Sequence, residues 1–103
     1  MMTKVQMRVN ELLYYFRLIE KDSRLTAWHV ALLMAILVMA MRQGRLVGIR
    51  VSRSKIMSQS HIYTAPTYHK YFKELQELGY ICYRPSYHPG LKSEIDLLTP
   101  YDK

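Results

Sequence analysis

The residues with the clearest chemical character lie in one short stretch, TYHKYFK, from Thr67 to Lys73. It combines hydroxyl, imidazole, ammonium and aromatic side chains, and it contains no carboxylate before Glu74. Hydroxyl, imidazole and ammonium groups can donate hydrogen bonds to phosphate oxygens and to acceptors on major-groove base edges. The stretch is therefore a candidate for nucleic-acid binding. A solvated basic helix face is the alternative interpretation.

The distribution of charge along the chain favours the nucleic-acid interpretation. The 103 residues contain 15 Lys and Arg against 8 Asp and Glu, which gives a formal net charge of +7. No acid occurs from Ser23 to Lys73. The basic residues of that range are Arg24, Arg42, Arg45, Arg50, Arg53, Lys55, Lys70 and Lys73. The surface built by this half of the chain should be positive, and its usual partners are phosphates, anionic lipids or acidic proteins.

A helix is expected to position the TYHKYFK side chains. Apolar residues recur at spacings of four, three and three, and they are Tyr68, Phe72, Leu75 and Leu78. This spacing predicts a helix that is capped by Thr64, tolerates Pro66 in its first turn and stops at Gly79. If the apolar residues face the core, the polar residues turn outward. The outward residues are Thr67, His69, Lys70 and Lys73.

Other elements are expected before and after this helix. The predicted elements before it are a helix over 3–20, an apolar helix over 26–43 ending at Gly44, a strand over 46–51 and a short helix over 52–60 capped by Ser52. Ser23 or Thr26 can cap the apolar helix. After Gly79, YICYR and SEIDLL alternate like two strands, and PSYHPGLK between them reads as a hairpin loop. The predicted fold class is mainly α with a small antiparallel β wing, an α+β fold.

The run from Val30 to Met41 is apolar throughout. It is shorter than the ~18 residues of a membrane span, so we expect a buried helix and no membrane partner. Because this helix is apolar all round, one face cannot be its only buried face. The N-terminal helix or a second copy of the chain must cover the rest, and we expect a homodimer. Cys82 is the only cysteine and the N-terminus lacks a signal-peptide pattern, which favours the cytoplasm.

From about residue 26 to residue 99 the chain resembles a winged helix-turn-helix domain. KIMSQSHI resembles the first helix and turn, TYHKYFKELQELGYI the recognition helix, and GYICYRPSYHPGLKSEIDLL the wing. The pieces TYHK, KELQELGYI, PSYHPG and KSEIDL are also similar to a small winged-helix family of bacterial mobile elements and prophages, whose members are mostly labelled transcriptional regulators. Many members have glycine in the turn where this chain has His61, a residue type that is enriched at positive φ. The expected domains are an N-terminal helix, residues 1–22, and a winged helix-turn-helix domain, residues 23–103.

The resemblance implies sequence-specific binding to double-stranded DNA by a transcriptional regulator. Lys70 and Lys73 would contact phosphate or guanine, and Thr67 and His69 would donate to base edges or phosphates. Thr64 would hold a phosphate at the helix N-terminus. The remaining candidates are Arg53 and Lys55 on the short helix, and Arg84, Tyr87, His88 and Lys92 in the wing.

Other functional classes have less support in the sequence. The histidines lack the spacing of a zinc site, so we expect no metal and no cofactor. No acid pairs with a nearby histidine in the sequence, and there is no glycine-rich phosphate loop, so we expect no enzyme. Two alternatives stay open: a protein–protein interaction module, and a replication or excision accessory protein that uses the same fold.

Overall fold

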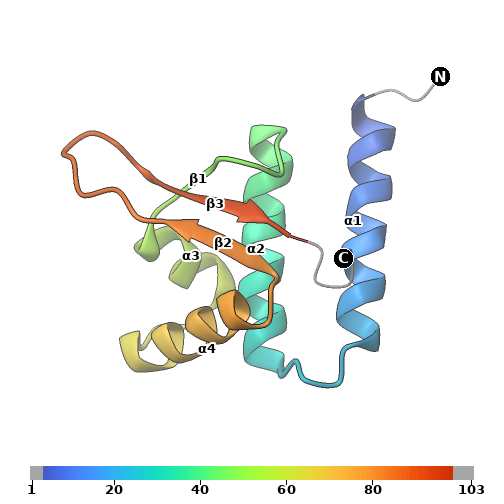
Figure 1. Cartoon of the computed structure of the whole chain (residues 1–103), viewed down its shortest axis with the longest axis horizontal. Coiled ribbons are helices and arrows are strands. Elements are labelled where there is room, and N and C mark those ends of the chain that lie inside the picture. Colours follow the sequence, from blue (N-terminus) through green and yellow to red (C-terminus); the bar gives the residue numbers. More distant parts are fainter. Residues whose placement is uncertain (1–3, 99–103) are drawn as a thin grey trace.

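A computed structural model describes residues 4–98, with side chains from residue 9 onward. It contains four helices and a small antiparallel sheet of three strands, which is the α+β fold class expected from the sequence. The predicted helix start at Thr3 lies outside the described residues. The elements in chain order are α1 Lys4–Lys21, α2 Ala27–Gln43, β1 Ile49–Val51, α3 Arg53–Ser60, α4 Ala65–Glu77, β2 Ile81–Arg84 and β3 Ser93–Leu97 (Figure 1).

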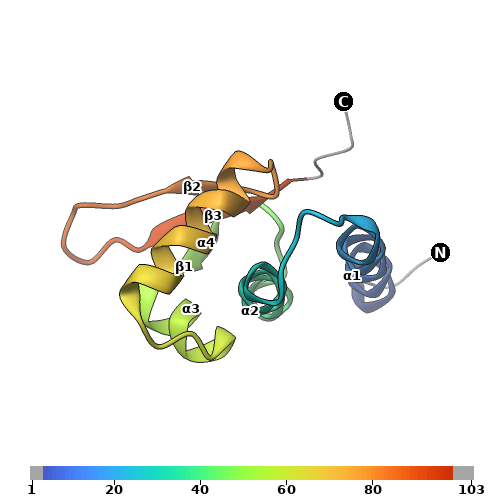
Figure 2. The same ribbon diagram turned by 90° about the horizontal axis from the view of Figure 1, so that it is seen from below.

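The apolar helix α2 is the centre of the molecule. Figure 2 shows it between α1 on one side and α3, α4 and the sheet on the other. Leu32, Leu33 and Ile36 are fully buried, and they belong to one cluster with buried residues of α3, α4 and the strands. Because neighbours from the same chain cover most of α2, its apolar character is largely explained within a single chain.

The ends of α2 follow the caps expected from the sequence. Thr26 is the N-cap, and its hydroxyl accepts from the backbone N–H of His29. The His29 ring accepts a hydrogen bond from the Thr26 backbone N–H in return, so histidine takes the place that Glu or Gln has in the usual capping box. At the other end, Gly44 has a φ of 72° and stops the helix in the left-handed region.

The sheet has the order β1-β3-β2, with both neighbours antiparallel to the central β3. Ile95 on β3 pairs with Ile49 on β1 and with Tyr83 on β2. Ile49, Ile95 and Ile81 are buried toward the helices, as the two-residue alternation predicts. The hairpin from β2 to β3 and its loop extend away from the helices (Figure 1).

Two local predictions are wrong. The strand expected over 46–51 is shorter, because Gly48 has a φ of 69° that interrupts extended backbone, and β1 begins at Ile49. Thr64 does occupy the N-cap position of α4, but its side chain makes no capping bond. Its hydroxyl instead donates to the Thr67 hydroxyl at 2.8 Å. The capping expected of Thr64 therefore fails at the side chain and holds for the backbone.

The end of α1 is tied to the rest of the fold by a buried carboxylate. Asp22 accepts from the Tyr80 hydroxyl at 2.8 Å and from the Arg24 guanidinium at 2.7 and 2.8 Å. Tyr80 is fully buried between α4 and β2, so this contact fixes the lower end of α1 to the winged half of the chain. Among the described residues, none of the helices combines the length and apolar character that crossing a membrane requires.

Candidate nucleic-acid interface

The helix α4 has the buried apolar face and the exposed polar face that the sequence predicts. Tyr68, Phe72 and Leu75 are buried in the core, and the Tyr68 and Phe72 rings stack at 5.1 Å between centroids. On the opposite side, His69, Lys70 and Lys73 are exposed and Thr67 is half-buried. Helical spacing therefore does place the four polar candidates outward, with the three aromatic and aliphatic anchors beneath them.

The short helix α3 adds two cations beside α4. Ser52 caps it by accepting from the backbone N–H of Lys55 at 3.3 Å. This cap places Arg53 and Lys55 in the first turn, where both side chains are exposed. Within residues 9–98, no carboxylate lies at ion-pair distance from Arg53, Lys55, Lys70 or Lys73. No described acid therefore neutralises these charges, and the Lys70 ammonium lies over the Tyr71 ring, 5.1 Å from its centroid.

The turn between α3 and α4 uses His61 as its left-handed residue, as the sequence analysis allowed. His61 has a φ of 60°, the one positive value at a non-glycine among the described residues. Its backbone N–H bonds to the carbonyl groups of Met57 and Ser58, which ends α3. Its ring lies 3.1 Å from the hydroxyl of Tyr63, which is 73% exposed. The turn thus presents an imidazole and a phenol next to the N-terminus of α4.

The direction of α4 is fixed by a hydrogen bond from α2. His29 is buried, and its Nδ1 accepts from the backbone N–H of Thr26 at 2.8 Å. The proton of the neutral ring is therefore on Nε2, which donates to Glu74 Oε1 at 2.7 Å. Beside this bond, Trp28 stacks on Tyr71 at 6.0 Å and Tyr71 meets His29 edge-on at 4.9 Å.

Sequence reasoning, which considers only acids with a histidine nearby in the sequence, does not predict this pair. His29 and Glu74 are 45 residues apart in sequence, and only the crossing of α2 and α4 brings them together. Both ring nitrogens of His29 are occupied and the ring is 2% exposed, so it cannot take a proton from a bound substrate. The pair joins α2 to α4, at the residue directly after Lys73.

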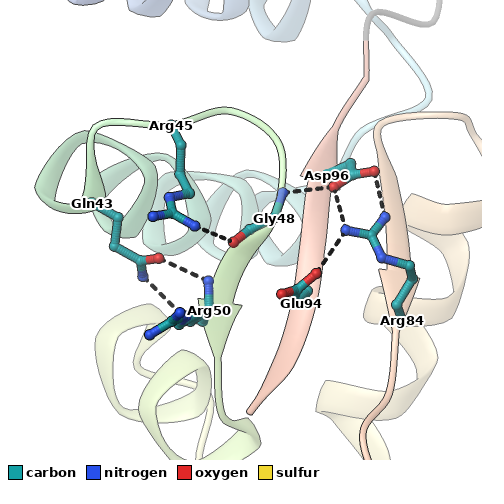
Figure 3. A network of polar contacts seen from close by, with 7 residues as sticks. All are labelled: Gln43, Arg45, Gly48, Arg50, Arg84, Glu94 and Asp96. Carbon is teal, nitrogen blue, oxygen red and sulfur yellow. Dashed lines mark hydrogen bonds and ion pairs between the residues drawn. The ribbon is translucent and has the colours of Figure 1, made fainter. Parts of the chain in front are cut away.

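The base of the wing is held by a polar network (Figure 3). Arg84 on β2 bonds Asp96 Oδ1 at 2.8 Å and Glu94 Oε1 at 3.0 Å, both on β3. Asp96 also accepts from the backbone N–H of Gly48 at 2.8 Å. These contacts, with the Arg84 guanidinium first, lower the pKa of Asp96 from its ordinary value. Since two carboxylates engage Arg84, we do not base a DNA contact on it.

The other wing candidates lie on the loop between β2 and β3. Tyr87 is 88% exposed, and His88 and Lys92 are exposed as well. The backbone N–H of Leu91 bonds the His88 carbonyl at 3.2 Å, and Gly90 closes this turn at a φ of 85°. The loop extends on the side of the molecule away from α1 (Figures 1 and 2). The described candidates therefore gather on α3, α4 and the wing loop.

Three contacts of this region were not found from the sequence. They are the His29–Glu74 bond, the Asp22–Tyr80 bond and the side-chain bonds of Gln43 to the backbone N–H and carbonyl of Arg50, both at 2.8 Å. The one available signal was a histidine three residues after Thr26, in the capping-box position. In the described part of the chain, no group of three or more His, Cys, Asp or Glu side chains is arranged to hold a metal ion.

Comparison with known proteins gives no relative from which to assign this surface: no protein-family model, curated protein or solved structure matches the chain.

Proposed function

We propose that the chain binds double-stranded DNA and acts as a transcriptional regulator of the winged-helix kind. The observation that carries the proposal is the outer face of α4, where His69, Lys70 and Lys73 are exposed together and no described carboxylate pairs with the two lysines. A 13-residue helix is about 20 Å long and about 10–12 Å wide with its side chains, which fits a major groove about 12 Å wide.

Each part of the surface has a role that follows from its chemistry. Lys70 and Lys73 would meet phosphates or guanine acceptors, and His69 and Thr67 would donate to base edges. Arg53 and Lys55 at the start of α3 would contact the sugar–phosphate backbone on the near side of the groove. The first-turn amides of α4 have no acceptor within the helix, and they would add to a phosphate site beside Thr64.

The wing would make a second, weaker contact. Tyr87, His88 and Lys92 lie on the exposed loop, and they can reach phosphates or an adjacent minor groove if α4 occupies the major groove. Arg84 would instead keep the two wing strands together through Glu94 and Asp96. Specificity would therefore come mainly from α4, and affinity from the cations of both helices.

The first experiment measures binding of a labelled random-sequence duplex and a matched single strand by fluorescence anisotropy at low and moderate salt. We expect duplex binding that weakens with salt, with a log–log slope of about −0.9 for each phosphate neutralised. Equal binding to the single strand would contradict groove recognition. Absence of duplex binding at low salt would favour a protein–protein interaction module.

Two charge-matched variants separate the α4 face from net charge alone. Lys70→Glu with Lys73→Glu reverses two charges on α4, and Arg17→Glu with Lys21→Glu reverses two exposed charges on α1. Each pair lowers the net charge from +7 to +3, since two reversals remove four units. We expect duplex affinity to fall at least about 100-fold for the α4 pair and only a few-fold for the α1 pair. Equal losses would mean that long-range charge explains the binding.

A further inference from the structure

The helix α1 carries an apolar face that the rest of the described chain leaves exposed. Val9, Leu13 and Phe16 are spaced four and three apart, so they lie along one side of the helix. Leu13 is 49% exposed, although it is a leucine in the middle of an 18-residue helix. Tyr15, by contrast, is 3% exposed and belongs to the core cluster. One apolar side of α1 therefore contacts the core, and a second apolar side does not.

The helix α2 carries a matching exposed row. Met34, Val38 and Met41 follow the same spacing of four and three, and their side chains are 36–39% exposed. From Ala27 to Met41 the sequence of α2 contains no Lys, Arg, Asp or Glu. An exposed row of three large apolar side chains on such an uncharged helix differs from the scattered apolar residues of an ordinary surface.

The two rows belong to one face. The helices α1 and α2 run antiparallel and side by side (Figures 1 and 2). Where two antiparallel helices touch, some residues lie to one side of the touching residues. Residues that are rotated away from the touching residues in the same direction about each helix axis lie on the same side of the pair. Leu13 and Phe16 are rotated in this direction from Tyr15, and Met34 and Val38 are rotated in it from Leu37. We call the six residues the α1–α2 face, and they are Val9, Leu13, Phe16, Met34, Val38 and Met41.

A cleft opens beside this face. It has a volume of about 420 Å³ and lies between α1, the C-terminal half of α2 and the segment that follows it. Its walls are mainly apolar and include Leu12, Leu37 and Val47. Met41 lines the cleft and also belongs to the α1–α2 face. The surface therefore offers projecting apolar side chains and a recess of a size that could receive such side chains.

We propose that the α1–α2 face binds a second copy of this chain, so that two antiparallel helix pairs pack about a two-fold axis as a four-helix bundle. An isologous contact needs one surface that is complementary to itself, and a face with both projections and a recess meets this condition. The lack of charge along α2 also removes the like-charge repulsion that two copies, each with a net charge of +7, would otherwise meet there.

The six side chains of the α1–α2 face supply about half of the area that a standard interface buries per partner. Six large apolar side chains that are 36–49% exposed present roughly 400 Å² per copy, since a large side chain has about 150–250 Å² to bury. A stable interface of standard size buries about 800 Å² per partner. The walls of the cleft beside the face can supply part of the remainder. Helical spacing places Met34, Val38 and Met41 on the side of α2 opposite to His29, which bonds α4, so dimerisation would leave both α4 surfaces accessible.

The mass in solution tests this proposal without DNA, so its result is independent of the proposed function. Light scattering from about 1 to 100 μM should give a wild-type mass of twice 12.2 kDa at the upper end. Leu13→Glu and Val38→Glu should each weaken the dimer at least about 100-fold. Leu91→Glu in the wing loop is the matched control, because this leucine is 65% exposed and outside the face; it should remain dimeric.

Two results would overturn the proposal: a wild-type monomer at about 100 μM, or a dimer that persists in both folded face variants. Circular dichroism establishes whether the variants fold. Hydrogen exchange of the wild-type chain provides a measurement that needs no substitution. On dilution below the dissociation constant, amides of residues 9–16 and 34–41 should lose protection, and those of the wing loop should not change. Loss of protection confined to other segments would place the contact elsewhere and reject this interface.

Discussion

At the scale of single residues, the bond from the Tyr80 hydroxyl to Asp22 is a buried polar contact. Asp22 shows what such a contact requires, because a carboxylate with a side chain that is 2% exposed must be paired. The Arg24 guanidinium, with help from the Tyr80 hydroxyl, holds the pKa of Asp22 well below its ordinary value of 3.8. The ionised carboxylate is therefore part of the folded state, and protonation opposes folding.

Asp22→Asn should change how stability depends on pH. The folded-state pKa is depressed, so the contribution of Asp22 is fully present above about 3.8 and is lost as pH falls through and below that value. We expect the variant to lose about 1–3 kcal/mol of unfolding free energy at pH 7, and less as pH drops toward 3. Urea unfolding at pH 7, 5 and 3 measures this. Glu20→Gln, an exposed acid on α1, serves as the control; a gap between Asp22→Asn and wild type that is constant with pH would contradict the assignment.

The His29–Glu74 bond supports a second prediction at this scale. Glu74→Gln keeps an oxygen that can accept from His29 Nε2, whereas Glu74→Ala leaves that buried donor without its described partner. We expect Glu74→Ala to lose about 1–2 kcal/mol of stability and Glu74→Gln to lose less than half of that. Both variants remove the same charge, so a comparison of their duplex affinities isolates the positioning of α4. Equal affinity and equal stability for the two would show that the bond does not hold the helix.

At the scale of elements, the turn between α3 and α4 is the junction on which the candidate interface depends. His61 takes the left-handed conformation there, which costs a residue with a Cβ about 1–2 kcal/mol relative to right-handed backbone. Glycine avoids this cost, and histidine bears it while placing its ring beside Tyr63. The turn between α3 and α4 thus takes its left-handed residue without a glycine.

Substitutions at position 61 should measure the free-energy cost of the left-handed backbone directly. His61→Gly should leave the unfolding free energy unchanged or raise it by up to about 1 kcal/mol, and His61→Val should lower it by about 1–2 kcal/mol because a β-branched side chain suits this backbone poorly. Urea unfolding provides both values. Tyr63→Phe controls for the exposed ring contact and should have little effect. A valine variant as stable as wild type would mean that the turn does not need a left-handed residue.

Sequence patterns predicted elements better than they predicted contacts between elements. The caps Thr26 and Ser52, the stop at Gly44 and the outward row on α4 follow from interactions within a few residues, so a local pattern is enough to predict them. The partners of His29 and Asp22 lie 45 and 58 residues away. These two contacts depend on how the elements cross in space, which a local sequence pattern does not predict. The carboxylate partners of Arg84 likewise lie across a hairpin, on β3, and a local pattern does not predict them.

At the scale of the whole molecule, exposed cations and exposed apolar side chains lie on different surfaces. The candidate interface carries cations on α3 and α4 that pair with none of the described carboxylates, and the α1–α2 face across the core is largely uncharged. Like charges gathered on one surface repel one another in the free protein and are relieved when an anion binds. The surface proposed for DNA binding is therefore expected to lower the stability of the unbound chain.

Changes in salt concentration and in surface charge should show whether this repulsion lowers the stability of the unbound chain. Raising NaCl from about 20 to 300 mM should increase the wild-type Tm, because the Debye length shortens to below the spacing of neighbouring helices. Arg53→Gln with Lys55→Gln, which removes two exposed cations from the first turn of α3, should raise the Tm at low salt by a few degrees and reduce its salt dependence. Thermal unfolding followed by circular dichroism measures both effects. A Tm that changes equally for this pair and for Arg17→Gln with Lys21→Gln, on α1, would rule out local repulsion.

The position of β3 in the sheet has a consequence for synthesis of the chain. Both of its partners, β1 and β2, are made before it, yet β3 lies between them. During translation α1 and α2 can pair early, since short segments separate them, but the sheet must wait until residues 93–97 leave the ribosome. Until then β1 and β2 keep unpaired edges, which are exposed to other nascent chains. An mRNA truncated just before codon 93 should therefore yield a helical but aggregation-prone product.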